Sequence, residues 1–134
     1  MEIRELAQIT GVADTTIRYY EDIQILPPPA RKENGYREYR ESDVERLRLV
    51  AGLRRLDFSL DDIKEILDLR DRQIAPCDVL LDLLGKKAKD IQHRITELQR
   101  LNTQLEDLHT VGEDFPRDDI QGKHCVCHLV SESQ

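Results

Sequence analysis

The chain has 134 residues, of which 39% are hydrophobic and 35% are charged, and its formal net charge is −7. It is too apolar to be disordered, but with no Trp and only two Phe it has few large side chains for a thick core. The absence of an apolar run of about 18 residues argues against a membrane-spanning helix, and the N-terminus lacks the basic-then-apolar order of a signal peptide. We therefore expect a slender cytoplasmic protein that buries surface against a partner chain.

Positive charge is concentrated in residues 31–55. Eight bases and five acids give this window a net charge of +3, although the whole chain is acidic. The bases are Arg31, Lys32, Arg37, Arg40, Arg46, Arg48, Arg54 and Arg55. Because an acidic protein can bind DNA when its positive charge lies on one face, double-stranded DNA is a candidate partner.

Two short helices around a tight turn are predicted at the start of the chain. Apolar residues recur on one face of residues 2–9, and the Thr-Gly pair that follows ends this helix. The stretch TTIRYYEDIQIL predicts a second helix, capped by Asp14 or Thr15, that buries Ile17 and Tyr20. Two packed helices occur in many small domains, but this arrangement is also that of a helix-turn-helix. Its second helix would present four residues to a DNA groove: Thr15, Thr16, Arg18 and Tyr19.

The stretch PPPARKENGYREYR, residues 27–40, predicts a small hairpin wing. The prolines cannot continue a helix, and Asn34-Gly35 is a strong turn signal. Arg gives charge-assisted hydrogen bonds to phosphate oxygens, and Tyr adds a hydroxyl and a flat surface. A solvated turn is the alternative, but the density of basic and aromatic side chains favours phosphate contact. The candidate contacts are Arg31, Lys32, Tyr36, Arg37 and Tyr39.

A pair of helices is predicted after the wing. SDVERLRLVAGLRRLD would begin at a cap provided by Ser42, and SLDDIKEILDLRD would begin at Ser59 with a capping-box acid at Asp62. We expect the two helices to form a hairpin that packs on the first pair. The predicted buried positions are Val44, Leu47, Val50, Leu53, Leu60, Ile63, Ile66 and Leu67.

A long helix is the clearest pattern in the chain. Apolar residues alternate at spacings of four and three over more than four heptads, and a helix of 33 residues would be about 50 Å long. The seam residues are Cys77, Leu81, Leu84, Ala88, Ile91, Ile95, Leu98, Asn102, Leu105 and His109. The helix could fold back on its own domain, but one chain has little left to cover the seam, so we expect a homodimer. The stripe alone does not distinguish parallel from antiparallel pairing.

The order of motifs TIRYYE, LPPPAR, NGYREY and LDFSLDDIK resembles the DNA-binding domain of the MerR family of transcriptional regulators over about residues 1–70. The long helix and the cysteine-bearing tail are similar to the metal-sensing branch, in particular to its sensors of divalent heavy metals. The resemblance implies a dimer with antiparallel long helices, which distorts an overlong promoter when its effector binds and acts on RNA polymerase through that promoter. It also implies that Thr16, Arg18 and Tyr19 meet the DNA groove and backbone. The wing contacts that it implies are Arg31, Tyr36, Arg37 and Tyr39.

Cys77 stands at the start of the long helix, where the resemblance implies a ligand of sensors for divalent ions. Two thiolates neutralise Cu⁺, whereas Zn²⁺, Cd²⁺, Pb²⁺ or Hg²⁺ accept more donors. An odd number of thiols in a reducing cytosol favours free or metal-bound cysteines over disulfides. Three thiols are too few for the usual iron–sulfur cluster.

The tail KHCVCHLVSESQ departs from the family pattern, because no Cys lies near residues 110–113 and both tail thiols are in Cys125-Val126-Cys127. A C-x-C pair can chelate one ion, and His124 or His128 could add a nitrogen ligand. In an antiparallel dimer, Cys77 of one chain would lie near the tail of the other, so the site would bridge subunits. The alternatives are a packing role for Cys77 and a disordered tail.

These patterns predict a mainly α-helical chain in three parts. Residues 1–72 would form a winged helix-turn-helix domain with a helical hairpin, residues 76–110 a dimerisation helix in an antiparallel coiled coil, and residues 111–134 a metal-binding loop and tail. The expected function is activation of transcription in response to a thiophilic divalent ion. The alternatives are a MerR-type regulator that senses Cu(I), redox state or an organic ligand. An enzyme is not expected, because no pocket-building domain holds a catalytic base.

Overall fold

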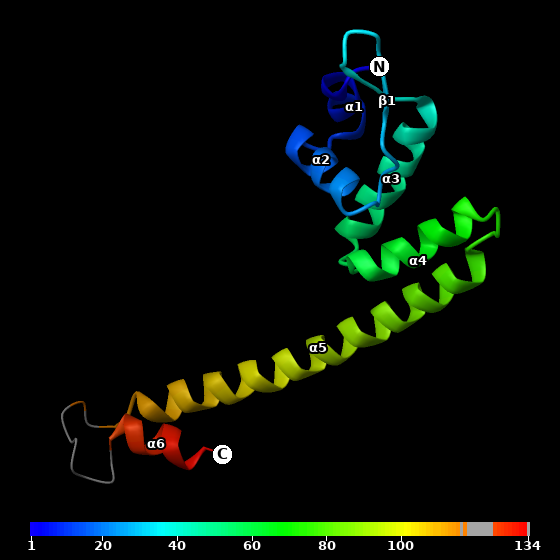
Figure 1. Cartoon of the computed structure of the whole chain (residues 1–134). Coiled ribbons are helices and arrows are strands. Elements are labelled where there is room, and N and C mark those ends of the chain that lie inside the picture. The colour runs from blue at the N-terminus through cyan, green and yellow to red at the C-terminus, as the bar shows by residue number, and fades with distance from the viewer. Residues whose placement is uncertain (116, 118–124, 134) are drawn as a thin grey trace. The chain divides into compact units, whose positions relative to one another are not determined.

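The computed structural model describes residues 1–115, 117 and 125–133. It divides the chain into two compact units, Met1–Leu84 and Gly85–Gln134 (Figure 1). The described residues form six helices and one two-stranded sheet, which confirms the mainly helical fold. None of the helices in this described part has the length and apolar character that a bilayer crossing requires.

The first unit is built from the helix-turn-helix, the wing and the helical hairpin. Its elements are α1 (Ile3–Thr10), α2 (Asp14–Asp22), β1 (Ala30–Arg31), β2 (Arg37–Glu38), α3 (Glu41–Arg55) and α4 (Leu60–Asp71). One cluster of buried side chains from all four helices forms its core, and Phe58 between α3 and α4 is 1% exposed. Leu80 and Leu83, in the first turns of the long helix α5 (Cys77–Gly112), also pack against this cluster.

The second helix of the helix-turn-helix is shorter than predicted. It ends at Asp22, after which Gln24 adopts a φ of +66°. The backbone N–H groups of Ile25 and Leu26 both donate to the carbonyl of Tyr20, at 2.8 and 3.1 Å. This turn carries two apolar side chains into the core instead of along the helix. The N-cap is Ala13, so the prediction of a cap by Asp14 or Thr15 is wrong.

The predicted wing is present, and its turn is a three-residue loop. Antiparallel pairing joins Ala30 to Glu38 and Arg31 to Arg37. The N–H of Lys32 donates to the carbonyl of Tyr36 at 2.8 Å, and the N–H of Gly35 donates back to Lys32 at 2.9 Å. Gly35 alone within the loop has a positive φ, of +85°. A two-residue Asn-Gly turn would need positive φ at both residues, so Gly35 here closes a longer loop with a bulge.

The helical hairpin buries the predicted stripe, with Val44, Leu47, Val50, Leu53, Ile63, Ile66 and Leu67 all 4% exposed or less. Leu60 is only half-buried. Ser59 caps α4 as predicted, since its Oγ accepts from the N–H of Asp62 at 3.1 Å. The predicted cap at Ser42 is wrong, because α3 begins at Glu41 and Ser42 already lies inside the helix. The N–H of its N-cap, Arg40, donates instead to Asp43 Oδ2 at 2.8 Å.

Arg46 connects three segments of the first unit. Its Nε donates to the carbonyl of Ile25 at 2.7 Å, and its two Nη atoms reach the carboxylate of Asp71 at 2.6 and 3.1 Å. A bidentate pair of this kind fixes geometry as well as adding energy. The guanidinium therefore holds the loop after α2 against α3 and α4. One of the eight bases of the positive window thus makes intramolecular bonds that would compete with DNA contact.

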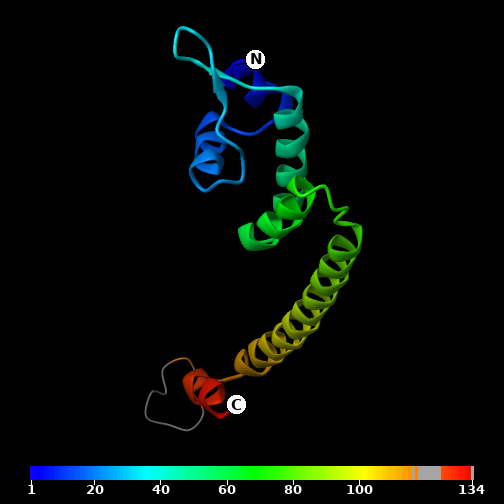
Figure 2. The same ribbon diagram turned by 45° about the vertical axis from the view of Figure 1, so that its right-hand side comes forward.

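The second unit contains the rest of α5 and a short helix, α6 (Val126–Glu132), that was not predicted. Figures 1 and 2 show α6 beside the C-terminal end of α5. Gly112 is buried there, and a Cβ at this position would lie 3.6 Å from Val126 and 3.8 Å from Leu129. Eight residues earlier on α5, Gln104 Nε2 donates to the carbonyl of Ser133 at 2.8 Å. The tail thus returns along the end of the long helix.

Candidate DNA interface and metal-ligating tail

The outer face of α2 carries the predicted recognition residues. Thr15, Arg18 and Tyr19 are exposed and Thr16 is half-buried, whereas Ile17 and Tyr20 point into the core. This division follows from the helical repeat of 3.6 residues, which separates the buried and the exposed positions around the helix. The structure therefore leaves the four candidate side chains on one accessible element.

The wing presents Arg31 and Tyr36 at its surface. Both are exposed, Tyr36 by 65%, and Arg31 Nη1 donates across the loop to the carbonyl of Gly35 at 3.0 Å. The guanidinium is therefore held at the tip of the hairpin. The structure leaves these two residues in a position to meet a phosphate backbone.

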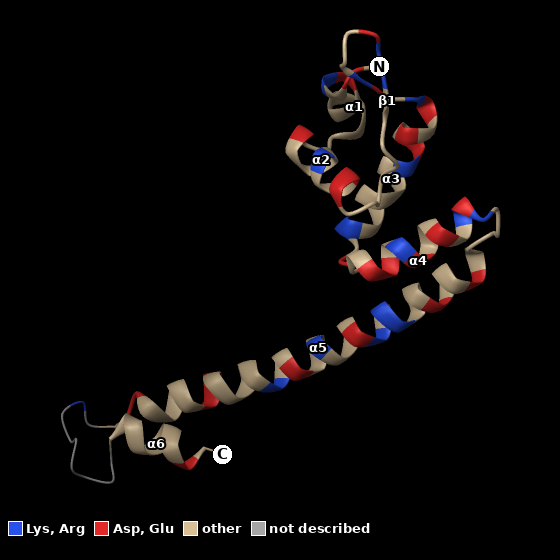
Figure 3. Ribbon diagram, viewed as in Figure 1, with Lys and Arg blue, Asp and Glu red and all other residues tan. Residues whose placement is uncertain are grey.

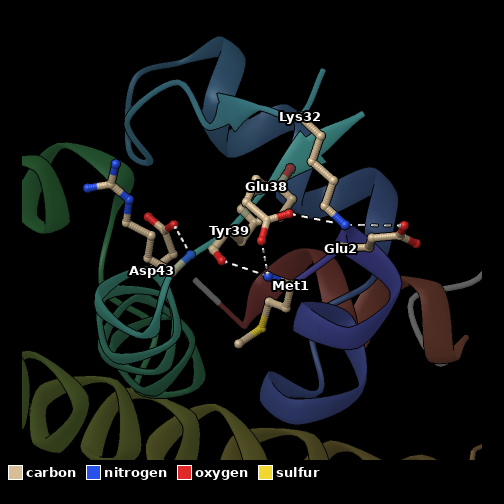
Figure 4. Close-up of polar contacts among 7 residues, drawn as sticks. Met1, Glu2, Lys32, Glu38, Tyr39 and Asp43 are labelled. Carbon is tan, nitrogen blue, oxygen red and sulfur yellow. Dashed lines mark hydrogen bonds and ion pairs between the residues drawn. The ribbon is translucent and has the colours of Figure 1, made fainter. Parts of the chain in front are cut away.

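Lys32 and the amino group of Met1 bind the base of the wing to α1 (Figure 4). The Met1 ammonium lies 3.1 Å from Glu38 Oε1 and donates to the carbonyl of Tyr39 at 2.9 Å. Lys32 Nζ lies 3.3 Å from Glu38 and 3.8 Å from Glu2. The hydrogen bond to Glu38 raises the pKa of Lys32, and the bond from the Met1 ammonium, followed by that from Lys32, lowers the pKa of Glu38. Lys32 therefore forms ion pairs with two acidic residues of its own chain.

The predicted DNA contact at Tyr39 is corrected by the structure. Its side chain is 3% exposed, and its hydroxyl donates to Glu21 Oε1. Burial of the ring and this bond raise the pKa of Tyr39. Arg37, two residues earlier, also reaches Glu21, from its Nε to Oε2 at 3.2 Å. Residues two apart in an extended strand share a side, and this side of β2 faces α2.

A hollow of about 590 Å³ separates α2 from the wing. Its walls come from α1, α2 and the hairpin, and they are Glu2, Ile3, Arg4, Asp14, Arg18, Tyr36 and Arg37. Three arginines and two acidic residues line it, and Arg37 is already paired with Glu21. Arg4 and Arg18 are therefore the bases of this hollow that could meet a phosphate group. Arg4 was missed by the sequence reasoning, because it lies outside the positive window, although its place on the polar side of α1 was a usable signal.

The positive window does not form one separate basic face. Figure 3 shows acidic and basic residues interspersed along the wing, α3 and α4. Lys32, Arg37 and Arg46 all have carboxylate partners within the first unit. The candidate DNA contacts with no such ion pair in the described structure are Arg18 and Arg31, together with the newly found Arg4. The local charge count thus overstated how many bases are available to DNA.

The two tail cysteines lie close together. Cys125 is the N-cap of α6 and 8% exposed, while Cys127 is exposed in its first turn. A hydrogen bond between the two thiols is the main cause that raises the pKa of Cys127. His128 Nε2 lies 3.0 Å from Glu132, and His124 is outside the described residues. The C-x-C pair thus lies at the start of α6.

Cys77 is the exposed first residue of α5, and the tail thiols follow the end of the same helix. Within the described ranges, which omit 116, 118–124 and 134, no three His, Cys, Asp or Glu side chains are grouped closely enough to hold a metal ion. The three-cysteine ligand set therefore stays a prediction.

Gly112 offers a test of how the C-x-C pair is held. We expect Gly112→Leu to displace α6, because the added side chain meets Val126 and Leu129, and overpacking costs about 1–3 kcal/mol. The reaction of Cys125 with a thiol reagent should accelerate between about fivefold and 100-fold. The measurement uses a chain in which the other two cysteines are Ser. Gly112→Ala is the matched control, since a Cβ there makes only ordinary contacts; equal rates in all three chains would contradict the packing role of Gly112.

Family models match most of the chain. The model described as "MerR HTH family regulatory protein" matches residues 1–69, and the model described as "MerR, DNA binding" matches residues 44–108. Together they cover the helix-turn-helix, the wing, the helical hairpin and most of α5. The order of elements described above is therefore the order of this family.

Two curated relatives extend the similarity beyond the DNA-binding domain. The mercuric resistance operon regulatory protein of Bacillus cereus is 41% identical over 106 residues, which are 79% of this chain and 80% of the relative. Heavy metal-dependent transcription regulator 2 of Rhizobium meliloti is 40% identical over 119 residues, which are 87% of this chain and 80% of the relative.

Solved structures share the fold. The transcription regulator PbrR691 from Ralstonia metallidurans in complex with lead(II) is 30% identical, covers 98% of both chains and has a TM-score of 0.78. HiNmlR, a MerR family regulator solved bound to promoter DNA, is 26% identical, covers 83% of this chain and 84% of its own, and has a TM-score of 0.59. With its family matches, its relatives and its fold in agreement, the chain belongs to the MerR family of transcriptional regulators and is not an enzyme.

Proposed function

We propose that this protein is a metal-responsive activator that binds promoter DNA as a homodimer and holds a thiophilic divalent ion between its subunits. Cys77 of one protomer and Cys125 and Cys127 of its partner would be the ligands. The observation that carries the proposal is the place of Cys125 and Cys127, at the N-cap and in the first turn of α6, a helix that packs against the end of α5. A sulfur pair held on an ordered element is pre-arranged for chelation.

The seam of α5 supports a dimer. Leu81, Ile91, Ile95, Leu98 and Leu105 are each between 41% and 65% exposed in the single chain. A stripe of this length would be unusual on a monomer, whereas a second copy would cover it by knobs-into-holes packing. Antiparallel pairing of two α5 helices would set the start of one beside the end of the other. Cys77 and the partner's tail would then meet.

The donor set fits soft and borderline divalent ions. Zn²⁺, Cd²⁺, Pb²⁺ and Hg²⁺ all accept thiolate ligands, and His128 could supply a nitrogen if it left Glu132. His124 stays a candidate ligand on the sequence alone. The names of similar proteins mention mercury and lead, which supports an ion of this class for this chain. When bound, the ion would supply a cross-link between the two protomers.

The DNA-binding residues would act in pairs. Two first units on one rigid dimer can address two half-sites, with α2 in the major groove and the wing on the backbone. A change in their relative orientation on metal binding would deform the DNA between the half-sites and so alter how RNA polymerase meets the promoter. Such a regulator would work in the cytoplasm, where the bacterial chromosome lies.

A second candidate function rests on the same pair of cysteines. Cys125 and Cys127 could respond to oxidation by forming a disulfide, with no metal involved. Cu(I) sensing and an organic effector are further alternatives, although the position of a third thiol at Cys77 favours a divalent ion.

A metal panel distinguishes these functions. We expect a reporter behind the protein's own promoter to respond to one or more of Zn²⁺, Cd²⁺, Pb²⁺ and Hg²⁺, and the purified protein to bind that ion at one ion per three-thiol site. Cu⁺, Co²⁺ and peroxide are the comparison arms. Induction by peroxide in metal-free protein would support the redox function instead, and no response to any ion would overturn the metal proposal.

A further inference from the structure

We propose that Glu21 is a positioning residue that sets the angle between the recognition helix and the wing. The recognition helix and the wing are the two elements that would contact DNA, so this inference rests on the proposed function. Glu21 would act on DNA only through the two wing residues that it holds. It lies in the last turn of α2, outside the set of residues predicted to touch DNA.

Both oxygens of the Glu21 carboxylate are occupied by the wing. Oε2 accepts from Arg37 Nε at 3.2 Å, and Oε1 accepts from the hydroxyl of Tyr39. The Glu21 side chain is 9% exposed and Tyr39 is 3% exposed, so water competes little for these bonds. Charge-assisted hydrogen bonds at a partly buried carboxylate are the strong class. One acid thus joins the end of α2 to strand β2.

The wing is held on two sides. On the side of α1, the Met1 ammonium binds Glu38 and the carbonyl of Tyr39, and Lys32 pairs with Glu2 (Figure 4). On the side of α2, Glu21 binds Arg37 and Tyr39. The covalent connection between α2 and β2 runs through residues 23–36, and Arg46 fixes the first part of it at Ile25. The Glu21 bonds add a direct link between the end of α2 and strand β2, next to the residues that would meet DNA.

The sign of the effect on DNA binding separates this role from a general electrostatic one. A carboxylate near a DNA-binding surface repels phosphates, so its removal should strengthen DNA binding if charge were its only contribution. A positioning role predicts the reverse, because a wing free to move must be ordered when DNA binds. Loss of Glu21 should then weaken binding although it removes a negative charge.

The test is DNA affinity measured on the full-length protein. The probe is a labelled duplex that carries the operator enriched by the wild-type protein from a random-sequence library. We expect Glu21→Gln to weaken binding about tenfold. Tyr39→Phe, which changes no charge and keeps the ring, should weaken it between about twofold and tenfold. The double variant should lose less than the product of the two single losses, because both act through one contact.

Asp22→Asn is the matched control, since it removes the same charge from the next, exposed residue of α2. We expect it to bind DNA as tightly as the wild type, or more tightly. Thermal unfolding and a stoichiometric titration show that each variant is folded and fully active at the assay temperature. Tighter or unchanged binding by Glu21→Gln would overturn the positioning role, as would fully multiplicative losses in the double variant. If the wild type itself enriched no operator, DNA binding as proposed above would fail instead.

Discussion

Two variants that are silent when produced alone should regain a metal response when they are produced in the same cell. One carries Cys77→Ser, and the other carries both Cys125→Ser and Cys127→Ser. Each homodimer lacks thiols at both of its proposed sites, so we expect metal affinity to fall about 100-fold or more, since each ligand carries a few kcal/mol of the total binding free energy. In the mixed dimer, Cys77 of the second chain meets the intact tail of the first, and one complete site is restored.

Two quantities are measured: induction of the reporter by the ion that activates the wild-type protein, and the number of metal ions bound per purified mixed dimer. Random assortment makes roughly half of the dimers mixed when both chains are expressed equally. A pair of chains that both carry Cys77→Ser, one of them with a different affinity tag, is the control and should stay silent. Silence of the mixed pair, or induction in either Ser homodimer, would show that the site is not shared between subunits in this way.

Ile95→Asp should convert the dimer to a monomer and abolish tight operator binding. Ile95 is 42% exposed in the single chain, so the change should cost the monomer little. In a symmetric dimer it occurs twice, and loss of two buried isoleucines costs about 3–6 kcal/mol before the buried charges are counted. The dimer dissociation constant should rise roughly 100-fold to 10 000-fold. Operator affinity should fall with it, because a monomer meets only one half-site.

Sedimentation equilibrium measures the dimer, and titration of the operator duplex measures DNA binding. Thr96→Asp places the same charge one residue along α5, away from the seam, and should leave both quantities unchanged. Helical content of both variants, measured by circular dichroism in the monomeric range, shows whether α5 persists. A dimer of wild-type strength in Ile95→Asp would mean that this stripe is not the subunit interface.

Most of the first unit could be predicted because its signals are local. Leu47 and Val50 in α3, and Ile63 and Ile66 in α4, are spaced as the helical repeat requires, and all four are 0% exposed. Ser59 acts as a cap because its hydroxyl needs only the backbone three residues later. Gly35 lies at the one loop position with positive φ, where a residue without Cβ is favoured.

The wrong predictions concern side chains that could either face solvent or bind a residue far away in the sequence. Tyr39 was predicted to face DNA, but its ring is buried and its hydroxyl binds Glu21, 18 residues away. Lys32 and Arg46 counted toward the positive window, yet each has carboxylate partners that sequence spacing did not reveal. The N-cap of α2 is Ala13, which makes no side-chain cap bond, so residue type alone did not indicate where this helix begins.

Some features of the candidate metal site could also be predicted from the sequence, and others could not. The sequence identified the three cysteines and the seam of α5, since thiol content and heptad spacing can be read without coordinates. It did not reveal α6, because a helix of seven residues is too short to be stable by its own propensity. The helix packs on Gly112 through Val126 and Leu129, a contact between distant residues, and it carries Cys125 and Cys127 at its start.

The sequence by itself determined the order of helices, the helix-turn-helix with its wing, the exposed seam and the membership of a regulator family. These properties depend on periodicity, turn chemistry and local motifs, each contained within a few residues. Only the tertiary structure decided which bases stay available to DNA, that Glu21 joins the recognition helix to the wing, and that the tail packs on α5. These outcomes depend on pairings such as that of Glu21 with Arg37, 16 positions apart, and that of Gln104 with Ser133, 29 positions apart. A local pattern does not encode which of several possible partners a group will meet.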